Sequence, residues 1–253
     1  MRRLTFEGQG HNRFPVWSAD SQRVAFQSDR EGDLGIFWQR ADGAGTAERL
    51  TKADEGVSHI PESWAPDGER FLYNAGKGGA NSLWLFSLKD RTAARFDAVE
   101  SLARTLTGAV FSPDGRWVAY ASQEGRASSA VYVQPFPPTG AKYQISKNAD
   151  VGHHPMWSPD GAELLFNAGQ VAPLNAVRIT TQLGFTVGEA TPVPRPFQGA
   201  TPNFERPFDI SRDGQHFLGL IDAVQTQSGA PAAQQIQVVL NWFEELRARV
   251  PIQ

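Results

Sequence analysis

The sequence predicts an all-β fold, a five-bladed β-propeller of four-stranded antiparallel blades, on three observations. A short phrase that ends in aspartate and usually glycine occurs five times, and an apolar run follows it each time. The aspartates of successive copies lie 47, 47, 46 and 53 residues apart, which is close to the ~40–50 residue period of propeller blades. Plentiful glycine, proline and aromatic residues favour short strands and tight turns over helices. The five phrases occupy residues 17–21, 64–68, 111–115, 157–161 and 210–214.

Each phrase has the chemistry of a hairpin turn. Proline presets the first central φ angle, aspartate can bond the backbone two residues on, and glycine accepts positive φ. We therefore expect the turn aspartates to organise the backbone rather than to catalyse. They are Asp20, Asp67, Asp114, Asp160 and Asp213. Because Trp17, Trp64 and Trp157 recur at one blade position, we expect them to be packing residues.

Further apolar segments complete the predicted blades. Third strands are expected at residues 35–38, 82–86, 130–133, 176–179 and 236–240. Outer fourth strands are expected at residues 48–51, 94–96, 143–146 and 190–193, and the fifth copy lacks one. The blade repeats then cover about residues 14–51, 59–96, 106–146, 153–193 and 206–243 of a single domain spanning 1–253, with a short helical tail at 244–253.

The missing outer strand has a candidate at the N-terminus. Residues 2–5 read Arg-Arg-Leu-Thr and nearly repeat the outer strand at residues 48–51, Glu-Arg-Leu-Thr. We expect residues 2–6 to pair with the last blade and close the ring, because unpaired strand edges invite aggregation. The alternative is that these residues end a further upstream blade, in which case the chain is a fragment of a larger propeller.

Composition excludes several classes of partner and site. The net charge is −3, so no basic surface indicates nucleic-acid binding. No apolar run reaches the ~20 residues that span a bilayer, so we expect no membrane insertion. The chain has no cysteine, which excludes disulfides and thiolate metal sites. The first residues lack the apolar stretch of a signal peptide, and the compartment stays unknown.

The blade phrase resembles the repeat of the TolB-like (WD-type) β-propeller family. That repeat runs roughly P-x-W-S-P-D-G, an apolar strand, S-D-R-x-G, an aromatic strand and R-L-T. The first copy matches best, and the resemblance covers nearly the whole chain. Its matching residues are Pro15-Val16-Trp17-Ser18, Val24-Ala25-Phe26, Ser28-Asp29-Arg30-Glu31-Gly32, Ile36-Phe37-Trp38 and Arg49-Leu50-Thr51. The later copies have lost Ser-Asp-Arg, which we interpret in the first copy as a local turn and salt-bridge device.

A second resemblance concerns the C-terminus. Residues 238–246, Val-Val-Leu-Asn-Trp-Phe-Glu-Glu-Leu, look like the ending of propellers fused behind bacterial serine/threonine kinase domains. The chain itself has no glycine-rich phosphate loop followed by kinase signatures. The two resemblances imply a bacterial sensor or interaction module, and the TolB family favours a periplasmic or other extracytoplasmic setting.

The loops that lead into the innermost strands provide the candidate site. In a propeller these loops meet at one mouth of the central channel. Four of the five histidines fall in them, and converging neutral imidazoles could hold a divalent metal. Oligogalacturonate lyases are similar in outline, being propellers with a histidine-bound metal. The alternative is that the histidines are ordinary loop residues. The candidate ligand-binding residues are His11, Arg13, His59, Arg104, His153, His154, Glu205 and Arg206, with Glu62, Glu100 and Asp150 in the same polar rim.

No catalytic motif is present: neither G-x-S-x-G nor H-E-x-x-H nor a Walker loop occurs. We therefore predict a non-catalytic scaffold or sensor that binds a protein or small-molecule ligand at one face, with no cofactor. The alternative is a metal-dependent polysaccharide lyase or hydrolase that uses the histidine-lined mouth. A third hypothesis is a domain that modulates an attached catalytic domain.

Overall fold

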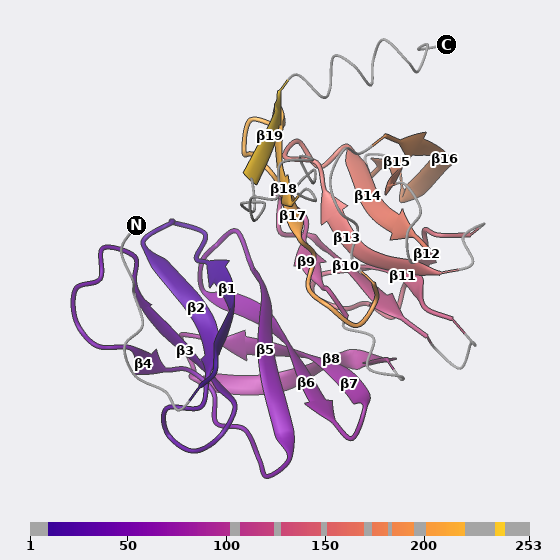
Figure 1. Cartoon of the computed structure of the whole chain (residues 1–253). Coiled ribbons are helices and arrows are strands. Elements are labelled where there is room, and N and C mark those ends of the chain that lie inside the picture. The colour runs from indigo at the N-terminus through magenta and orange to yellow at the C-terminus, as the bar shows by residue number, and fades with distance from the viewer. Residues whose placement is uncertain are drawn as a thin grey trace, which may run out of the picture.

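The computed structural model describes residues 10–101, 107–123, 128–147, 151–169, 174–181, 184–194, 201–220 and 236–240. Within these ranges, nineteen strands form five antiparallel sheets, four of four strands and one of three. Figure 1 shows them as successive blades whose first strands, β1, β5, β9, β13 and β17, face a common centre. The prediction of an all-β, five-bladed propeller is confirmed.

The strands follow one another in chain order from the innermost to the outermost of each blade. The first blade comprises β1 (Asn12–Trp17), β2 (Arg23–Ser28), β3 (Gly35–Arg40) and β4 (Glu48–Arg49). The second comprises β5 (Val57–Trp64), β6 (Arg70–Lys77), β7 (Ala80–Ser87) and β8 (Thr92–Ser101). The third comprises β9 (Val110–Phe111), β10 (Trp117–Ser122), β11 (Ala130–Pro135) and β12 (Tyr143–Gln144). The fourth comprises β13 (Gly152–Trp157), β14 (Glu163–Ala168), β15 (Leu174–Thr180) and β16 (Thr186–Val193), and the fifth β17 (Phe208–Ile210), β18 (His216–Leu220) and β19 (Ile236–Leu240).

The turn between the first two strands of each blade is built as the repeat predicts. In the first blade, Ser18 Oγ donates to Asp20 Oδ1 (2.6 Å), and the backbone N–H of Gln22 donates to the same oxygen (3.0 Å). The Ser18 hydrogen bond, helped by that backbone donor, lowers the pKa of Asp20. Corresponding backbone N–H groups donate to the other four aspartates. The turn aspartates are therefore structural, as predicted.

Aromatic residues at the end of the inner strands join each blade to the one before it. Trp64 packs among buried residues of the first blade and stacks on Trp38 with ring centroids 5.8 Å apart. Phe111 packs on the second blade and Trp157 on the third. The three side chains are only 8%, 7% and 7% exposed, so these interfaces, which we call seams, hold separate hydrophobic clusters between neighbouring blades.

The last blade touches the first at the turns. The Arg212 guanidinium donates to Ala19 O (3.1 Å) and Ser21 Oγ (2.7 Å). The same pairing of turn positions recurs elsewhere, because a Cβ on Gly115 would lie 3.4 Å from Pro66. The fifth and first blades therefore meet in the arrangement that consecutive blades use, which closes the ring on this face.

The inner strand of the first blade differs from its counterparts. Its residues alternate between half-buried and exposed, whereas every residue of β13 is buried. Trp17 is 57% exposed, so its predicted packing role is wrong, although those of Trp64 and Trp157 are confirmed. Unlike Trp64 and Trp157, Trp17 belongs to no hydrophobic cluster among the described residues.

Several predictions fall on residues outside the described ranges. They are the closing strand at residues 2–6, the helical tail at 244–253, the candidate ligand residue Arg104 and the rim residue Asp150. Within the ranges that are described, no helix has the length and apolar character needed to cross a membrane.

Candidate functional site

The mouth is the face where the inner strands begin, and one loop crosses it. Residues 201–207 are a described part of the segment between β16 and β17, drawn in orange in Figure 1. Its Asn203 shares a cavity of about 330 Å³ with Ser58 and Ile60 at the start of β5 and with the β6–β7 hairpin at residues 76–81. The loop that connects the fourth and fifth blades therefore reaches the second blade and forms part of the wall of this cavity.

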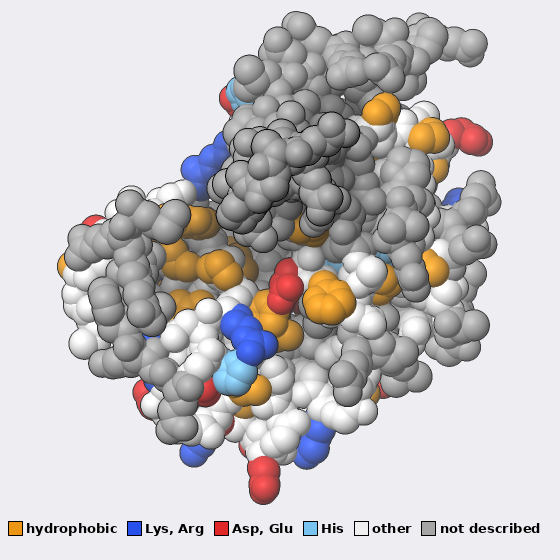
Figure 2. Space-filling model, viewed as in Figure 1, with side chains coloured by type: hydrophobic (Ala, Val, Ile, Leu, Met, Phe, Trp, Pro, Cys, Tyr) orange, Lys and Arg blue, Asp and Glu red, His pale blue; other side chains and the backbone are white. Residues whose placement is uncertain are grey.

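Four side chains around this face, those of His11, Arg13, Phe204 and Glu205, form no hydrogen bond or ion pair among the described residues. Arg13 and Glu205 are exposed and His11 is half-buried, and none of the three side chains has a hydrogen bond or ion pair among the described residues. Phe204 is 65% exposed. Figure 2 shows basic, acidic, histidine and hydrophobic side chains gathered at the centre of the same view. This mixture can bind a partner through apolar contact and charge pairing without any local rearrangement.

His59, by contrast, is part of the seam between the first two blades. Its Nδ1 lies 2.9 Å from Thr51 Oγ1, and its backbone O accepts from Gln27 Nε2 (2.8 Å). Burial lowers the pKa of His59 to about 4, although the carboxylates of Asp33 and Asp54 oppose the shift. The imidazole is therefore neutral at pH 7, and its contact with Thr51 helps to hold the first two blades together.

His153 and His154 form a buried pair at the seam between the fourth and fifth blades. Their Nδ1 atoms lie 2.6 Å apart, while His153 Nε2 faces Gly169 O (3.1 Å) and His154 Nε2 faces Phe204 O (2.6 Å). Each of these three contacts needs one proton, whereas two neutral imidazoles carry two. Burial, followed by the charges of His153 and Arg206, lowers the pKa of His154 to about 3. His154 is thus neutral at pH 7, and two neutral rings would satisfy only two of the three contacts at a time; the rings anchor the loop that leads into β17.

Arg206 and Glu62 also join neighbouring blades. Arg206 donates to Phe208 O (2.8 Å), to Pro155 O (3.2 Å) and to the Asp209 carboxylate (3.2 Å). Its guanidinium therefore links the fourth and fifth blades next to the histidine pair.

Glu62 links the second blade to the third. Its carboxylate accepts from Thr107 Oγ1 (2.6 Å) and from the backbone N–H groups of Gly108 and Ala109 (both 2.8 Å). Burial raises the pKa of Glu62 to about 7, against the opposing effect of these donors and of Asn74. We expected Glu62 in a solvated rim, and the structure places its carboxylate in a seam instead.

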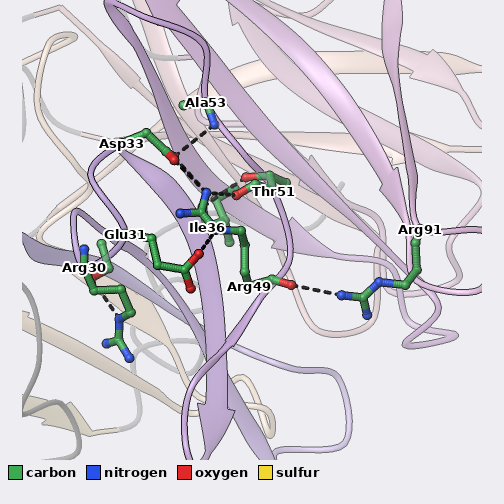
Figure 3. Close-up of polar contacts among 9 residues, drawn as sticks. Arg30, Glu31, Asp33, Ile36, Arg49, Thr51, Ala53 and Arg91 are labelled. Atoms are coloured by element: carbon green, nitrogen blue, oxygen red, sulfur yellow. Dashed lines mark hydrogen bonds and ion pairs between the residues drawn. The ribbon is translucent and has the colours of Figure 1, made fainter.

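A second cavity of about 570 Å³ lies beside the first seam, and its walls are acidic. Arg49 binds Glu31 (2.7 Å) and Asp33 (2.8 Å), and Asp33 also accepts from the backbone N–H of Ala53 (3.1 Å), as Figure 3 shows. Arg49 belongs to the Arg-Leu-Thr motif, and Glu31 and Asp33 lie in and just after the Ser-Asp-Arg-x-Gly motif. Arg49 therefore joins the two motifs of the first copy through Glu31 and Asp33, whereas within Ser28-Asp29-Arg30 the Arg30 guanidinium donates to Ser28 Oγ (3.1 Å).

The histidines do not gather around one metal position. His59 lies in the first seam, and His153 and His154 lie between the fourth and fifth blades. No group of three or more histidine, aspartate or glutamate side chains in the described residues is arranged to hold a metal ion. Within the part of the chain that the structure describes, the histidines thus do not fit the metal site that the lyase resemblance implied.

Comparisons with known proteins agree on the architecture. No family model matches the chain. The uncharacterized peptidase YuxL of Bacillus subtilis is 32% identical over 162 residues, which are 64% of this chain and 22% of YuxL. TolB from Acinetobacter baumannii superimposes on 91% of this chain with a TM-score of 0.65 at 19% identity, and the match covers 52% of that structure. This chain has a TolB-like propeller fold.

Another propeller neighbour is an enzyme by name. The oligogalacturonate lyase from Vibrio parahaemolyticus is 10% identical, with a TM-score of 0.56 over 90% of this chain and 62% of that one. This TolB-like propeller therefore spans about a fifth of YuxL and about half of the A. baumannii TolB structure. At such identities the solved structures establish the fold of the propeller.

The repeated sequence phrases did not indicate two residues of the mouth, Asn203 and Phe204. Asn203 and Phe204 lie in the long connection to the fifth blade, where the spacing of the turn aspartates rises to 53 residues. That longer interval was the one sign in the sequence that a loop here does more than connect two blades.

Proposed function

We propose that this TolB-like propeller is a non-catalytic binding module that holds a protein or small-molecule ligand at the mouth. The observation that carries the proposal is the contrast between two sets of polar residues. His59, His153, His154 and Arg206 are committed to the seams, whereas His11, Arg13 and Glu205 have no side-chain partner among the described residues.

The exposed Phe204 supports the same proposal. Its backbone O is fixed by His154 Nε2 at 2.6 Å, while its ring is 65% exposed. A large aromatic side chain on a fixed backbone loses little conformational freedom on binding, which is typical of the residues that dominate interfaces. Arg13 and Glu205 would then supply charge complementarity at the rim.

The test uses a photo-crosslinking residue at position 204, with the same residue at the exposed turn position 69 as the matched control. We expect a partner that crosslinks from position 204, does not crosslink from 69, and is lost in Arg13→Ala and Glu205→Ala variants. Equal crosslinking from both positions, or insensitivity to Arg13→Ala, contradicts the proposal.

The enzyme alternative is tested on the same protein. A metal-dependent lyase or hydrolase requires stoichiometric metal by elemental analysis, loss of that metal in His59→Gln/His153→Gln, and cleavage of oligogalacturonate. We expect the wild-type protein to leave oligogalacturonate intact, and the double variant to have the same metal content as wild type.

A further inference from the structure

Four seams between consecutive blades hold a recurring pair of apolar side chains. One member is the third residue of the second strand in the earlier blade, and the other is the last residue of the inner strand in the next blade. The two members contact the same hydrophobic cluster in each of these seams. The pairs are Ala25 with Trp64, Leu72 with Phe111, Ala119 with Trp157 and Leu165 with Ile210.

The corresponding pair in the seam between the fifth and first blades, which we call the closing seam, is exposed. Leu218 and Trp17 are 51% and 57% exposed, whereas seven of their eight counterparts are buried and Ile210 is half-buried. The turns of these two blades nevertheless meet, because Arg212 donates to Ser21 Oγ at 2.7 Å. An apolar position that is buried in four seams and exposed in the fifth indicates a surface that another segment covers.

The chain itself supplies a segment at this place. Leu240, the final residue of β19, lies opposite His216, the first residue of β18. His216 follows the turn whose Arg212 contacts the first blade. Residues 241–253 therefore continue from the end of the fifth blade at which the turns of the closing seam meet.

The sequence of this tail predicts a helix with one apolar side. Trp242, Phe243, Leu246 and Val250 have the spacing of one helical face, and the charged residues of the tail fall between them. Leu218 lies two residues along β18 from the strand's first residue, a distance of about 7 Å. A helix over residues 242–250, roughly 13 Å long, is long enough to reach it.

We propose that residues 241–253 dock onto the closing seam and that their apolar side covers Trp17 and Leu218. A segment that starts beside its own docking surface is present there at an effective concentration on the order of millimolar, which favours it over a second copy of the chain. The tail then supplies the cover that the neighbouring blade provides in the other seams. This inference does not depend on the proposed function of the mouth.

The test is paramagnetic relaxation enhancement, measured by nuclear magnetic resonance on the whole chain. Because the sequence has no cysteine, a spin label on Ala248→Cys, on the opposite side of the predicted helix from the apolar residues, marks the tail alone. The reporter is the indole Nε1–H signal of Trp17, assigned from its loss in Trp17→Phe. We expect the label to broaden this signal and to leave that of Trp117, in the third blade, unchanged.

Two substitutions remove the contact from either side. Trp242→Ser/Phe243→Ser should lower the docking equilibrium constant by about a hundredfold or more, the effect of no longer burying two large aromatic side chains, so that the broadening disappears. Leu218→Ser should weaken the broadening without removing a buried side chain. Glu244→Ser, on the charged side of the predicted helix, is the matched control and should change the broadening by less than about twofold.

The proposal is overturned if the Trp17 signal broadens no more than that of Trp117, or if Trp242→Ser/Phe243→Ser leaves the broadening unchanged. A mixture of isotope-labelled protein without a spin label and spin-labelled protein without isotopes tests for a second copy. Broadening of Trp17 in this mixture would show that the tail of another molecule covers the seam, which also overturns the proposal.

Discussion

Replacing Glu62 removes the acceptor that joins the second blade to the third. In Glu62→Ala, the backbone N–H groups of Gly108 and Ala109 and the hydroxyl of Thr107 lose the carboxylate that they bond at 2.6–2.8 Å. Thr107 and Ala109 are fully buried, so water cannot readily replace it. At roughly 1–3 kcal/mol for each unsatisfied buried group, the buried Ala109 N–H and Thr107 hydroxyl together predict a loss of about 2–6 kcal/mol in the free energy of unfolding, and the N–H of half-buried Gly108 can turn to water.

A conservative substitution of Glu62 should lower the free energy of unfolding by less than Glu62→Ala does. Glu62→Gln keeps one acceptor oxygen but turns an NH₂ donor toward a backbone N–H, so we expect it to lose about 1–3 kcal/mol. Glu69→Ala is the matched control, because Glu69 is an exposed turn residue whose side chain has no partner among the described residues. Its expected effect is within about 0.5 kcal/mol.

The assay is urea unfolding at pH 7, combined with amide hydrogen exchange at Gly108 and Ala109. The account requires Glu62→Ala to be clearly less stable than Glu62→Gln, and both amides to exchange faster than in wild type. A loss below about 1 kcal/mol in Glu62→Ala, or unchanged protection of the two amides, refutes the reasoning.

The remaining predictions concern a turn, a titration and a hydroxyl. Ser21 has a φ of 59° where the other four turns have glycine at 69–72°, but its Oγ also accepts from Arg212 (2.7 Å). In an Arg212→Ala background, where that hydrogen bond is already absent, Ser21→Gly should stabilise the protein by about 0.5–1 kcal/mol in urea unfolding; Gln22→Gly, at a neighbouring position without positive φ, should not stabilise it. The folded-state pKa of His59, about 4, lies below its ordinary value of 6.5. The stability that the neutral, buried His59 gives the folded protein is therefore fully present above pH 6.5 and is lost as the pH falls toward 4. Wild-type protein should therefore lose about 3 kcal/mol more than His59→Gln over this window, and parallel pH profiles would contradict the assignment. Ser158→Ala should cost about 1 kcal/mol, because Ser158 Oγ bonds both Asp160 and the backbone of Glu163; a neutral effect in urea unfolding would show that the turn does not need its hydroxyl.

Most of the architecture could be predicted from the sequence because it repeats. The turn phrase recurs with the same hydrogen bonds, so Asp20 and its four counterparts reveal both the turns and the strand order. Trp17 shows the limit of this inference. A position in a repeat specifies a residue's own blade but not how well the neighbouring blade covers it.

The site was harder to predict because its chemistry lies between blades. Loop position brought His59 and His154 into one candidate set, yet their rings bond Thr51 in one seam and Phe204 O in another. Arg23 and Trp64 stand 41 residues apart in the chain and meet only when two blades pack. Contacts of this kind leave no periodic signal, because each involves residues that the other copies lack.

The closed ring of five blades is the claim on which the proposed binding mouth depends, and the absence of cysteine makes it directly measurable. Spin labels on engineered cysteines at Gln215 and Gln22 report the distance between the last and first blades. Labels at Glu69 and Arg116, the same turn position in consecutive blades, give the reference. We predict equal distances by dipolar electron paramagnetic resonance, since Arg212 joins the end blades through Ser21. A distance between Gln215 and Gln22 that is clearly longer than the reference would contradict the closed ring.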